Sequence, residues 1–330
     1  MKYLITGGAG FIGSHLVEEL LNKKNKIIVL DNFSTGRKEN LKNFKNLHLI
    51  KCDISKKGNW IKKFKDIDCV FHIAALADIV PSINNPVKYY VSNVNGTLNV
   101  LEACKKYSVK KMIYTASSSC YGIPSKYPTA ENENIDNQYP YALTKYLGEQ
   151  LSLHWGKLFN IDVISLRLFN VYGTRSRTSG TYGAMFGVFL AQKLAGQPFT
   201  VVGDGNQTRD FTYVTDVVSA LVVAAKSKIK NEVFNVGSGK TISVNKIVEL
   251  LGGSKVKIPK RPGEPDCTYA NIKKIKKKLN WKPKIPIEKG VKLLINDIDY
   301  WKKAPVWTPK KINIATNDWF KYLGKNNYEK

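Results

Sequence analysis

The sequence predicts an α/β fold, in which a doubly wound parallel sheet is followed by a smaller C-terminal domain. Short runs of β-branched residues alternate with amphipathic helical stretches from the first residue onward, a rhythm typical of a parallel sheet with helices on both faces. After residue 168 this alternation loosens into loops and shorter elements. We therefore expect one domain at residues 1–168 and another at 169–330, with ligands bound beyond the carboxyl ends of the strands.

The first domain is predicted to alternate strands with helices, which include Ser14–Leu21 and Pro86–Tyr107. In the second domain we expect a helix near Val188–Ala195, a strand near Phe199–Val202 and a helix near Asp216–Lys226. The lysine-rich run Lys273–Leu279 keeps apolar residues at helical spacing and so predicts an exposed helix face. The strands of the first domain are predicted at Lys2–Thr6, Lys26–Asp31, Leu47–Lys51, Cys69–Ile73, Lys111–Ala116 and Asp162–Leu168.

The composition excludes a disordered chain, because 43% of the 330 residues are hydrophobic and 24% are charged. The net charge of +26 comes from 52 basic and 26 acidic residues, and 46 of the basic residues are lysines spread over the whole length. This spread favours a solvated surface over a polyanion-binding face, so we expect no nucleic-acid partner. Arginine persists best where its planar fork cannot be replaced. The six arginines are Arg37, Arg167, Arg175, Arg177, Arg209 and Arg261.

The five cysteines lie far apart and form no C-x-x-C pair, so they predict buried hydrophobic side chains in a reducing compartment. No apolar stretch approaches the roughly 18 residues that a membrane span needs, and the first residues do not resemble a signal peptide. We therefore expect a cytoplasmic protein with no membrane partner and no metal.

A glycine-rich segment joins the first predicted strand to the first predicted helix. Glycines at positions 7, 10 and 13 let the backbone turn tightly, approach a pyrophosphate and pack the helix on the strand. The N-terminus of the helix then faces the phosphates. In this strand-to-helix context the spacing predicts a Rossmann-type dinucleotide-binding domain.

Asp31 ends the second predicted strand, where a carboxylate accepts hydrogen bonds from ribose hydroxyls and repels a 2′-phosphate. NAD is therefore favoured over NADP, although Arg37 stands close enough in the sequence to accommodate a phosphate. Asp53 follows the third strand, and two interpretations stay open for it: a contact to the adenine or a turn cap.

Tyr141 and Lys145 are four residues apart at the start of a helical stretch, which places the phenol and the ammonium on one helix face. With 17 tyrosines and 46 lysines, about two such pairs are expected by chance, and Tyr107 with Lys111 is interpreted as one of them. Ser117 ends the fifth strand upstream of Tyr141. An ammonium beside the phenol, next to a cationic nicotinamide, is expected to lower the pKa of Tyr141 and make it a base near neutral pH.

These residues resemble the extended short-chain dehydrogenase/reductases, and within them the NAD-dependent epimerases and dehydratases of nucleotide sugars. The resemblance is strongest to the 4-epimerases of UDP-glucose and UDP-N-acetylglucosamine, and it runs from residue 1 to about residue 290. Several motifs agree in order and spacing: Thr6–Gly13, Asp31–Asn32, His72–Ala75, Asn93–Thr97, the Ser117, Tyr141 and Lys145 set, and Arg209–Val214.

The resemblance implies NAD as cofactor, a UDP-sugar as substrate and a second domain that binds the sugar nucleotide. The catalytic residues implied are Ser117, Tyr141 and Lys145. The implied substrate contacts are Ser118, Asn170, Thr268 and a clamp of Arg209 and Arg261 on the diphosphate and ribose. Arginine suits bidentate binding of phosphate oxygens. The implied cofactor contacts are Gly7, Gly10, Phe11, Ile12, Gly13, Asp31, Asn32, Asp53, Ile54, Ala74, Asn93, Tyr141 and Lys145.

Four further residues near the clamp have less direct roles. Asp210 and Asp216 are expected to hold the loop of Arg209 rather than to act in chemistry. Arg175 and Arg177 lie in a loop expected to cover the nucleotide, with surface salt bridges as the alternative.

The segment Ser117–Gly122 contains no carboxylate, whereas sugar dehydratases and decarboxylases of the superfamily usually carry one there. Transient oxidation at C4 is therefore favoured over dehydration. Thr268 occupies the position that borders the C2 substituent in the resemblance, and its small side chain predicts activity on UDP-GlcNAc and UDP-GalNAc as well as UDP-Glc and UDP-Gal. The alternatives are another nucleotide-sugar epimerase, a reductase or a dehydratase, or an NAD-bound regulator that binds RNA.

Two features bear on assembly. The helix that begins near Tyr141 is apolar on more than one side and needs a second burial surface. The resemblance implies that this surface is supplied by two-helix packing in a homodimer. The last thirty residues hold Trp301, Trp307 and Trp319. This tail is expected to pack over the second domain, with a partner or dimer contact as the alternative.

Overall fold

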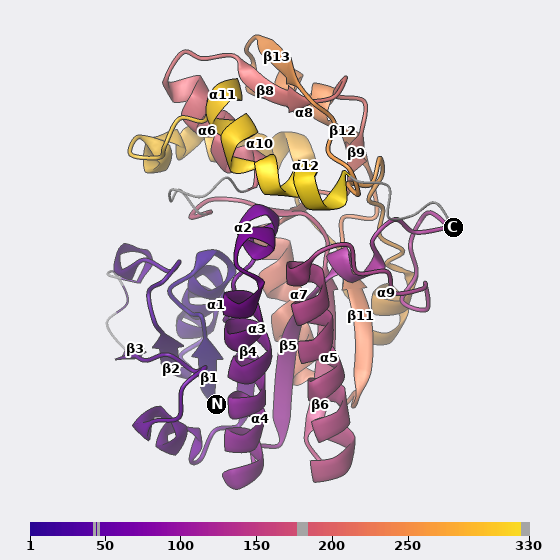
Figure 1. Ribbon diagram of the computed structural model, residues 1–330. Helices are drawn as coiled ribbons and strands as arrows, with labels where there is room; N and C mark the ends of the chain where they lie inside the picture. Colours follow the sequence, from indigo (N-terminus) through magenta and orange to yellow (C-terminus); the bar gives the residue numbers. More distant parts are fainter. Residues whose placement is uncertain (42–43, 45–46, 177–183, 325–330) are drawn as a thin grey trace.

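The structure is a computed structural model that describes residues 1–41, 44, 47–176 and 184–324. In the view of Figure 1 a larger α/β domain lies below a smaller domain that carries the C-terminal helices. None of the helices in these described ranges is long and apolar enough to cross a membrane.

The larger domain is built on a seven-stranded parallel sheet with the order β11-β6-β5-β4-β1-β2-β3. The order runs outward in both directions from β1, which is the arrangement of a doubly wound dinucleotide-binding sheet, and it confirms the predicted fold class. The strands are β1 (Lys2–Thr6), β2 (Lys26–Asp31), β3 (Leu47–Lys51), β4 (Cys69–His72), β5 (Lys111–Ser117), β6 (Asp162–Leu168) and β11 (Glu232–Val236).

Helices cover both faces of this sheet, and α4 and α5 lie in front of it in Figure 1. Side chains of β1 alternate between the two faces. Tyr3 and Ile5 join the core under α1 and α7, while Leu4 joins the core under α4 and α5. The helices are α1 (Phe11–Asn22), α2 (Ile79–Asn84), α3 (Pro86–Tyr90), α4 (Gly96–Lys106), α5 (Pro140–Phe159), α7 (Val214–Lys226) and α9 (Lys273–Leu279).

The predicted helix over Pro86–Tyr107 is interrupted. A π-helical turn at Val91–Asn95 separates α3 from α4. In this turn the buried Asn93 side chain accepts a hydrogen bond from the N–H of Leu76 at 2.8 Å and donates to the Leu76 carbonyl at 3.0 Å. A third bond, from Asn93 to the Thr144 hydroxyl at 3.1 Å, ties the turn to α5. The irregular turn thus places one amide between a loop and a neighbouring helix.

The chain returns to the larger domain after residue 168. Strand β11 pairs in parallel with β6, α7 packs against α1, and α9 packs against β11. In α9 the apolar Ile275 and Leu279 are buried while most of the lysines are exposed, so the prediction of an exposed helix face is confirmed. The division into two domains at residue 168 stays a proposal. The elements β11, α7 and α9 come after that residue but pack on the larger domain.

The smaller domain has its own core, built on Phe189, Ile247, Leu294 and Trp301. Three short strand pairs support it: β8 (Phe199–Val202) with β13 (Lys255–Ile258), β9 (Thr208–Arg209) with β12 (Ile242–Ser243), and β7 (Val171–Tyr172) with β10 (Thr212–Tyr213). The helices are α6 (Met185–Leu194), α8 (Val244–Leu251), α10 (Ile287–Asn296), α11 (Pro309–Ala315) and α12 (Asn317–Leu323).

Candidate active site

A cavity of about 660 Å³ lies between the carboxyl ends of the sheet strands and the smaller domain. This is the position in which open α/β sheets bind their ligands. Nearly every residue predicted for the site lines it: Gly7, Gly10, Phe11, Ile12, Gly13, Asp31, Asn32, Asp53, Ile54, Ala74, Ser117, Ser118, Tyr141, Lys145, Asn170, Arg209, Arg261 and Thr268. Asn93 does not, because its side chain is turned to the loop at Leu76 and to α5.

The glycine-rich loop has the close backbone contacts that its sequence predicts. Gly7 has a φ of +73°, and a Cβ there would lie 2.7 Å from the backbone nitrogen of Ala74. At Gly13 a Cβ would lie 2.1 Å from the carbonyl oxygen of Gly7. Gly10 caps the N-terminus of α1, and its Cβ would meet only the Gly7 oxygen, at 3.2 Å. A phosphate group can therefore approach the start of α1 closely.

Asp31 is buried at the end of β2 and faces the cavity. One carboxylate oxygen accepts the N–H of Ala9 at 2.9 Å and the other accepts the N–H of Phe33 at 2.8 Å. Burial raises the pKa of this carboxyl, and the two backbone bonds oppose that rise. Each oxygen keeps a free lone pair, so the carboxylate can still accept ribose hydroxyls. The loop and Asp31 together fit an NAD molecule.

Asp53 forms the turn cap that was one of its two interpretations, and the contact to the adenine stays a prediction. Its Oδ1 atom accepts the N–H of Ser55 at 3.0 Å and the hydroxyl of Ser55 at 2.7 Å, which is a turn cap. Asp53 also lines the cavity on the side of the cofactor loop.

Ser117 and Tyr141 meet at the carboxyl end of β5. The Oγ of Ser117 lies 2.7 Å from the Oγ of Ser119, and Ser117 lies near enough to Tyr141 to lower the pKa of the phenol. Tyr141 follows Pro140, which starts α5 with a backbone angle already suited to a helix. The first turn of α5 therefore aims the phenol at the end of the sheet.

Lys145 is buried one helical turn after Tyr141, with its Nζ atom 4.5 Å from the centroid of the Tyr114 ring. Burial lowers the pKa of Lys145 to about 7, against the opposing charge of Glu149. The expectation of a lowered Tyr141 pKa is not met in the protein alone. Burial raises the pKa of Tyr141, and the hydrogen bond from Ser117 offsets only part of this rise. The physical reason is desolvation, which acts on both members of the pair.

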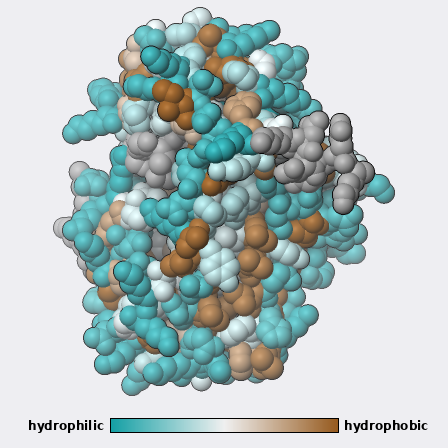
Figure 2. All heavy atoms as spheres, viewed as in Figure 1, coloured by the Kyte–Doolittle hydropathy of each residue, from teal (hydrophilic) through white to brown (hydrophobic). Residues whose placement is uncertain are grey.

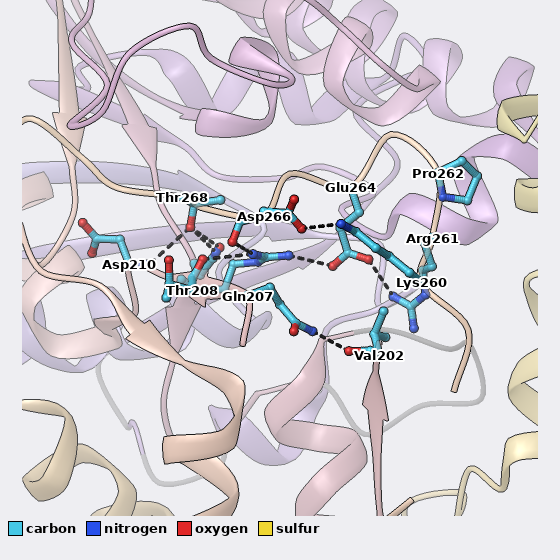
Figure 3. A network of polar contacts seen from close by, with 12 residues as sticks. Val202, Gln207, Thr208, Asp210, Lys260, Arg261, Pro262, Glu264, Asp266 and Thr268 are labelled. Atoms are coloured by element: carbon cyan, nitrogen blue, oxygen red, sulfur yellow. Dashed lines mark hydrogen bonds and ion pairs between the residues drawn. The ribbon is translucent and has the colours of Figure 1, made fainter. Parts of the chain in front are cut away.

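The two predicted clamp arginines converge on Glu264, which the sequence analysis missed. Nη2 of Arg209 lies 2.9 Å from one oxygen of Glu264, and Nη1 of Arg261 lies 3.7 Å from the other. Figure 3 shows Glu264 facing Arg261 across the turn that joins them. Gly263 in this turn has a φ of +70°. The Arg-Pro-Gly-Glu spacing is the signal that could have predicted the return of Glu264 toward Arg261.

Asn170 and Thr268 lie side by side in the cavity wall. The Asn170 amide donates to the Thr268 hydroxyl at 3.4 Å, and the N–H of Asp210 donates to the same hydroxyl at 3.1 Å. Both side chains are short, so this part of the wall leaves space beside the clamp.

The carboxylates of Asp210 and Asp216 each accept hydrogen bonds from backbone N–H groups of other segments. Asp210 accepts the N–H groups of Ser238 at 2.6 Å and Ala270 at 3.0 Å, so it ties the segment after Arg209 to two other loops. Asp216 accepts the N–H of Ile285 at 2.9 Å and that of Lys284 at 3.0 Å, contacts that lie outside the loop of Arg209.

The covering loop is described only in part. Arg175 forms an ion pair with Glu18 at 2.6 Å, as in the salt-bridge alternative, and it also lines the cavity. Arg177 lies outside the described residues.

The C-terminal tail packs over the smaller domain, as expected. Ile312 and Trp319 belong to its core. The tail also reaches the cavity, whose wall includes Tyr300, Trp307 and Trp319. No local pattern in the sequence predicted this position, because it depends on contacts with residues far away along the chain.

The fold and the site are those of a dinucleotide-dependent enzyme whose cavity holds a tyrosine and lysine pair and two arginines. A family model for the NAD dependent epimerase/dehydratase family matches residues 3–237. The chain belongs to this family, and the resemblance noted in the sequence is confirmed.

Among the relatives is a putative UDP-glucose 4-epimerase of Methanocaldococcus jannaschii, 39% identical over 89% of this chain and 97% of the relative. A solved UDP-N-acetylglucosamine 4-epimerase from Methanobrevibacter ruminantium M1, in complex with UDP-N-acetylmuramic acid, is 34% identical with a TM-score of 0.84 and covers 89% of this chain and 98% of its own. A solved UDP-glucuronic acid 4-epimerase from Bacillus cereus, in complex with UDP-glucuronic acid and NAD, is 34% identical with a TM-score of 0.84. The match covers 92% of this chain and 99% of that one.

Proposed function

We propose that this NAD-dependent enzyme interconverts UDP-sugars that differ in configuration at C4. The observation that carries the proposal is the placement of Ser117, Tyr141 and Lys145 in one cavity with the glycine-rich loop and the arginine clamp. The three side chains are suited to removing a hydroxyl proton, and the glycine-rich loop is suited to holding a dinucleotide beside them. The clamp is suited to holding the diphosphate of the substrate.

In this mechanism Tyr141 accepts the proton of the 4-hydroxyl, and Ser117 holds the same oxygen by a hydrogen bond. The glycine-rich loop and Asp31 would hold NAD, which would supply the acceptor and donor of the hydride at C4. Arg209 and Arg261 keep the diphosphate in place while the 4-keto sugar turns, so that its opposite face is presented for the return. Tyr141 then gives the proton back. No net oxidation results.

The proton step needs a phenolate, which burial alone disfavours at Tyr141. Lys145 lies one helical turn after Tyr141 and lines the same cavity, so in its protonated form it can stabilise the phenolate, and the cationic nicotinamide is expected to add to this effect. We therefore assign Lys145 the role of lowering the pKa of Tyr141 in the complex.

A C4 epimerase requires no further acid or base, and the segment that follows Ser117 fits this requirement. Ser118, Ser119 and Cys120 carry no carboxyl group. Four carboxylates line the cavity within the described residues. Asp31 and Asp53 lie on the cofactor side, Glu264 is paired with the clamp, and Asp78 precedes α2, outside the segment that follows Ser117. Proton removal at C5, which dehydration needs, has no base in this segment.

Thr268 supports the wider substrate range. Its hydroxyl is held by Asn170 and by the backbone of Asp210, which draws the side chain against the wall. An N-acetyl group at C2 can fit beside a side chain of this size. We propose turnover of UDP-GlcNAc and UDP-GalNAc together with UDP-Glc and UDP-Gal. Separate incubation of the purified protein with UDP-galactose and UDP-GlcNAc, followed by resolution of the products, tests both the reaction and the range.

The proposed assembly is a homodimer. Figure 2 shows hydrophobic surface gathered over the helices that face the viewer, α3, α4 and α5 in Figure 1. Val87 in α3 and Leu143 and Leu158 in α5 are 70%, 45% and 63% exposed. Large apolar side chains on neighbouring helices favour burial against a second copy of the same face.

A further inference from the structure

The C-terminal tail bridges the two domains. The short helix Ile298–Trp301, at which the tail begins, places the Tyr300 hydroxyl 3.2 Å from Oδ1 of Asn40 in the larger domain. Its last helix, α12, packs against α2, and Figure 1 shows α12 along the edge of the smaller domain that faces α2. The tail therefore touches both walls of the cavity.

Trp319 in α12 is the residue of the tail that reaches the clamp. Its indole N–H donates a 2.7 Å hydrogen bond to the carbonyl oxygen of Pro262, the residue after Arg261. The guanidinium carbon of Arg261 lies 5.4 Å from the centroid of the Trp319 ring. One side chain thus contacts both the backbone and the charged group of the clamp turn.

The same ring is linked to Tyr141 through Tyr139, which lies between them. Its centroid is 6.2 Å from that of Tyr139, and the Tyr139 ring is stacked on Tyr141 at 6.5 Å with an angle of 4°. Trp319 is 2% exposed, so these contacts are made out of water, where a hydrogen bond and a cation–π contact are stronger.

We propose that Trp319 is a positioning residue for UDP-sugar binding: it fixes the Arg261 turn so that the guanidinium meets the diphosphate. The inference rests on the proposed function and adds a role for the tail. The Arg261-Pro262-Gly263-Glu264 turn includes a glycine at positive φ. The Pro262 carbonyl held by the indole anchors this turn from outside.

Two substitutions separate the contacts of Trp319. Trp319→Phe keeps a ring beside Arg261 and Tyr139 and removes the N–H donor. Trp319→Leu removes both. Trp301→Phe is the matched control, because Trp301 is buried in the same tail at 1% exposure but does not line the cavity. Circular dichroism and thermal denaturation show whether each variant is folded.

The readout is the affinity for UDP and for uridine, measured by calorimetry on the NAD-loaded protein. Uridine lacks the diphosphate. If the Arg261 guanidinium no longer meets the diphosphate, UDP binding alone should weaken. Loss of one well-formed hydrogen bond predicts about a tenfold rise in the Kd of UDP for Trp319→Phe, with a larger rise for Trp319→Leu. The Kd of uridine, the NAD content and both affinities of Trp301→Phe should stay at wild-type values.

Two results would overturn the proposal while the proposed function stands: an unchanged UDP affinity in folded Trp319→Leu, or equal losses for UDP and uridine, which a general loosening of the smaller domain would produce. Wild-type protein that does not bind UDP would overturn the proposed function, and this inference with it.

Discussion

Nη2 of Arg209 lies 2.9 Å from Oε1 of Glu264, and this ion pair fixes the first clamp arginine before any diphosphate arrives. The same guanidinium donates to the carbonyl oxygen of Thr208 at 2.9 Å. Because the Arg209 guanidinium is already held in place, less side-chain entropy is lost when a diphosphate binds.

Arg209→Lys should therefore raise the KM for a UDP-sugar by about tenfold and leave kcat within a few-fold, because a lysine cannot keep both contacts and bind phosphate bidentately. Steady-state kinetics check this. The control is Lys260→Met, which removes a neighbouring exposed cation paired with Asp266. A fall in kcat at constant KM would assign Arg209 to the chemical step instead.

Tyr141→Phe should reduce turnover by at least about a hundredfold, the lower end of what general acid–base catalysis contributes, while NAD stays bound. Tyr107→Phe is the control, because Tyr107 has the same spacing to a lysine, and the structure places it at the end of α4. Activity assays and the nicotinamide content of the purified variants provide the readout. A Tyr141→Phe variant with wild-type turnover would remove the phenol from the mechanism.

Lys145 should make stability depend on pH. Its pKa is lowered to about 7 in the folded protein, below the ordinary value of 10.5 that it regains on unfolding. Between these values the unfolded chain binds more protons, so the free energy of unfolding rises with pH from about 7 toward 10, by at most about 1.4 kcal/mol per pH unit.

This dependence can be isolated by comparison with Lys145→Met. Urea unfolding of both proteins at pH 7 and pH 9 should show a greater gain in stability for the wild type. Equal gains would indicate that Lys145 keeps its charge in the folded state.

The buried pair of Glu149 and Arg167 should matter for stability. Nη2 of Arg167 lies 2.6 Å from Oε1 of Glu149, and Ser165 donates to the same carboxylate at 2.8 Å. Glu149→Gln leaves a buried guanidinium without its counter-charge, at an expected cost of about 3–5 kcal/mol in the free energy of unfolding. The double variant with Arg167→Met should recover part of it. A loss below about 1 kcal/mol in urea unfolding would contradict this.

The proposed dimer predicts that Leu158→Glu yields a monomer, because a charge would be buried against the second copy. Ile314→Glu is the matched control: Ile314 is 68% exposed on α11, away from α4 and α5. Sedimentation velocity distinguishes the two states. A monomeric wild-type protein would refute the assembly.

The substrate range depends on Thr268. Thr268→Tyr should lower turnover of UDP-GlcNAc relative to UDP-Glc, because a bulky ring fills the space beside C2. The ratio of kcat/KM values measures this. Absence of UDP-GlcNAc turnover in the wild type, with no relative gain for UDP-Glc in the variant, would contradict the proposed role.

Much of the fold was predictable because its signals are local. The strands β1, β2, β3 and β6 have the predicted bounds, since each is a short apolar run between polar breaks. The glycine loop and the spacing of Tyr141 and Lys145 likewise depend only on neighbouring residues.

Other features depend on contacts across the chain. The bond from Trp319 to Pro262 joins residues 57 positions apart, and the pair of Arg209 and Glu264 joins residues 55 positions apart. The π-helical turn is tied to Leu76, far from the turn in sequence. Spacing likewise shows that a lysine is near Tyr141, but not that burial raises the pKa of the phenol and lowers that of the lysine in the protein alone.

The central claim is that C4 is oxidised and reduced within one active site. Incubation of the purified enzyme with UDP-galactose in D2O, without added nicotinamide, tests it most directly by NMR and mass spectrometry of the product. The account predicts UDP-glucose with hydrogen retained at C4 and C5 and no net change in nicotinamide absorbance. Deuterium at C5, or a product lighter by water or carbon dioxide, would contradict it.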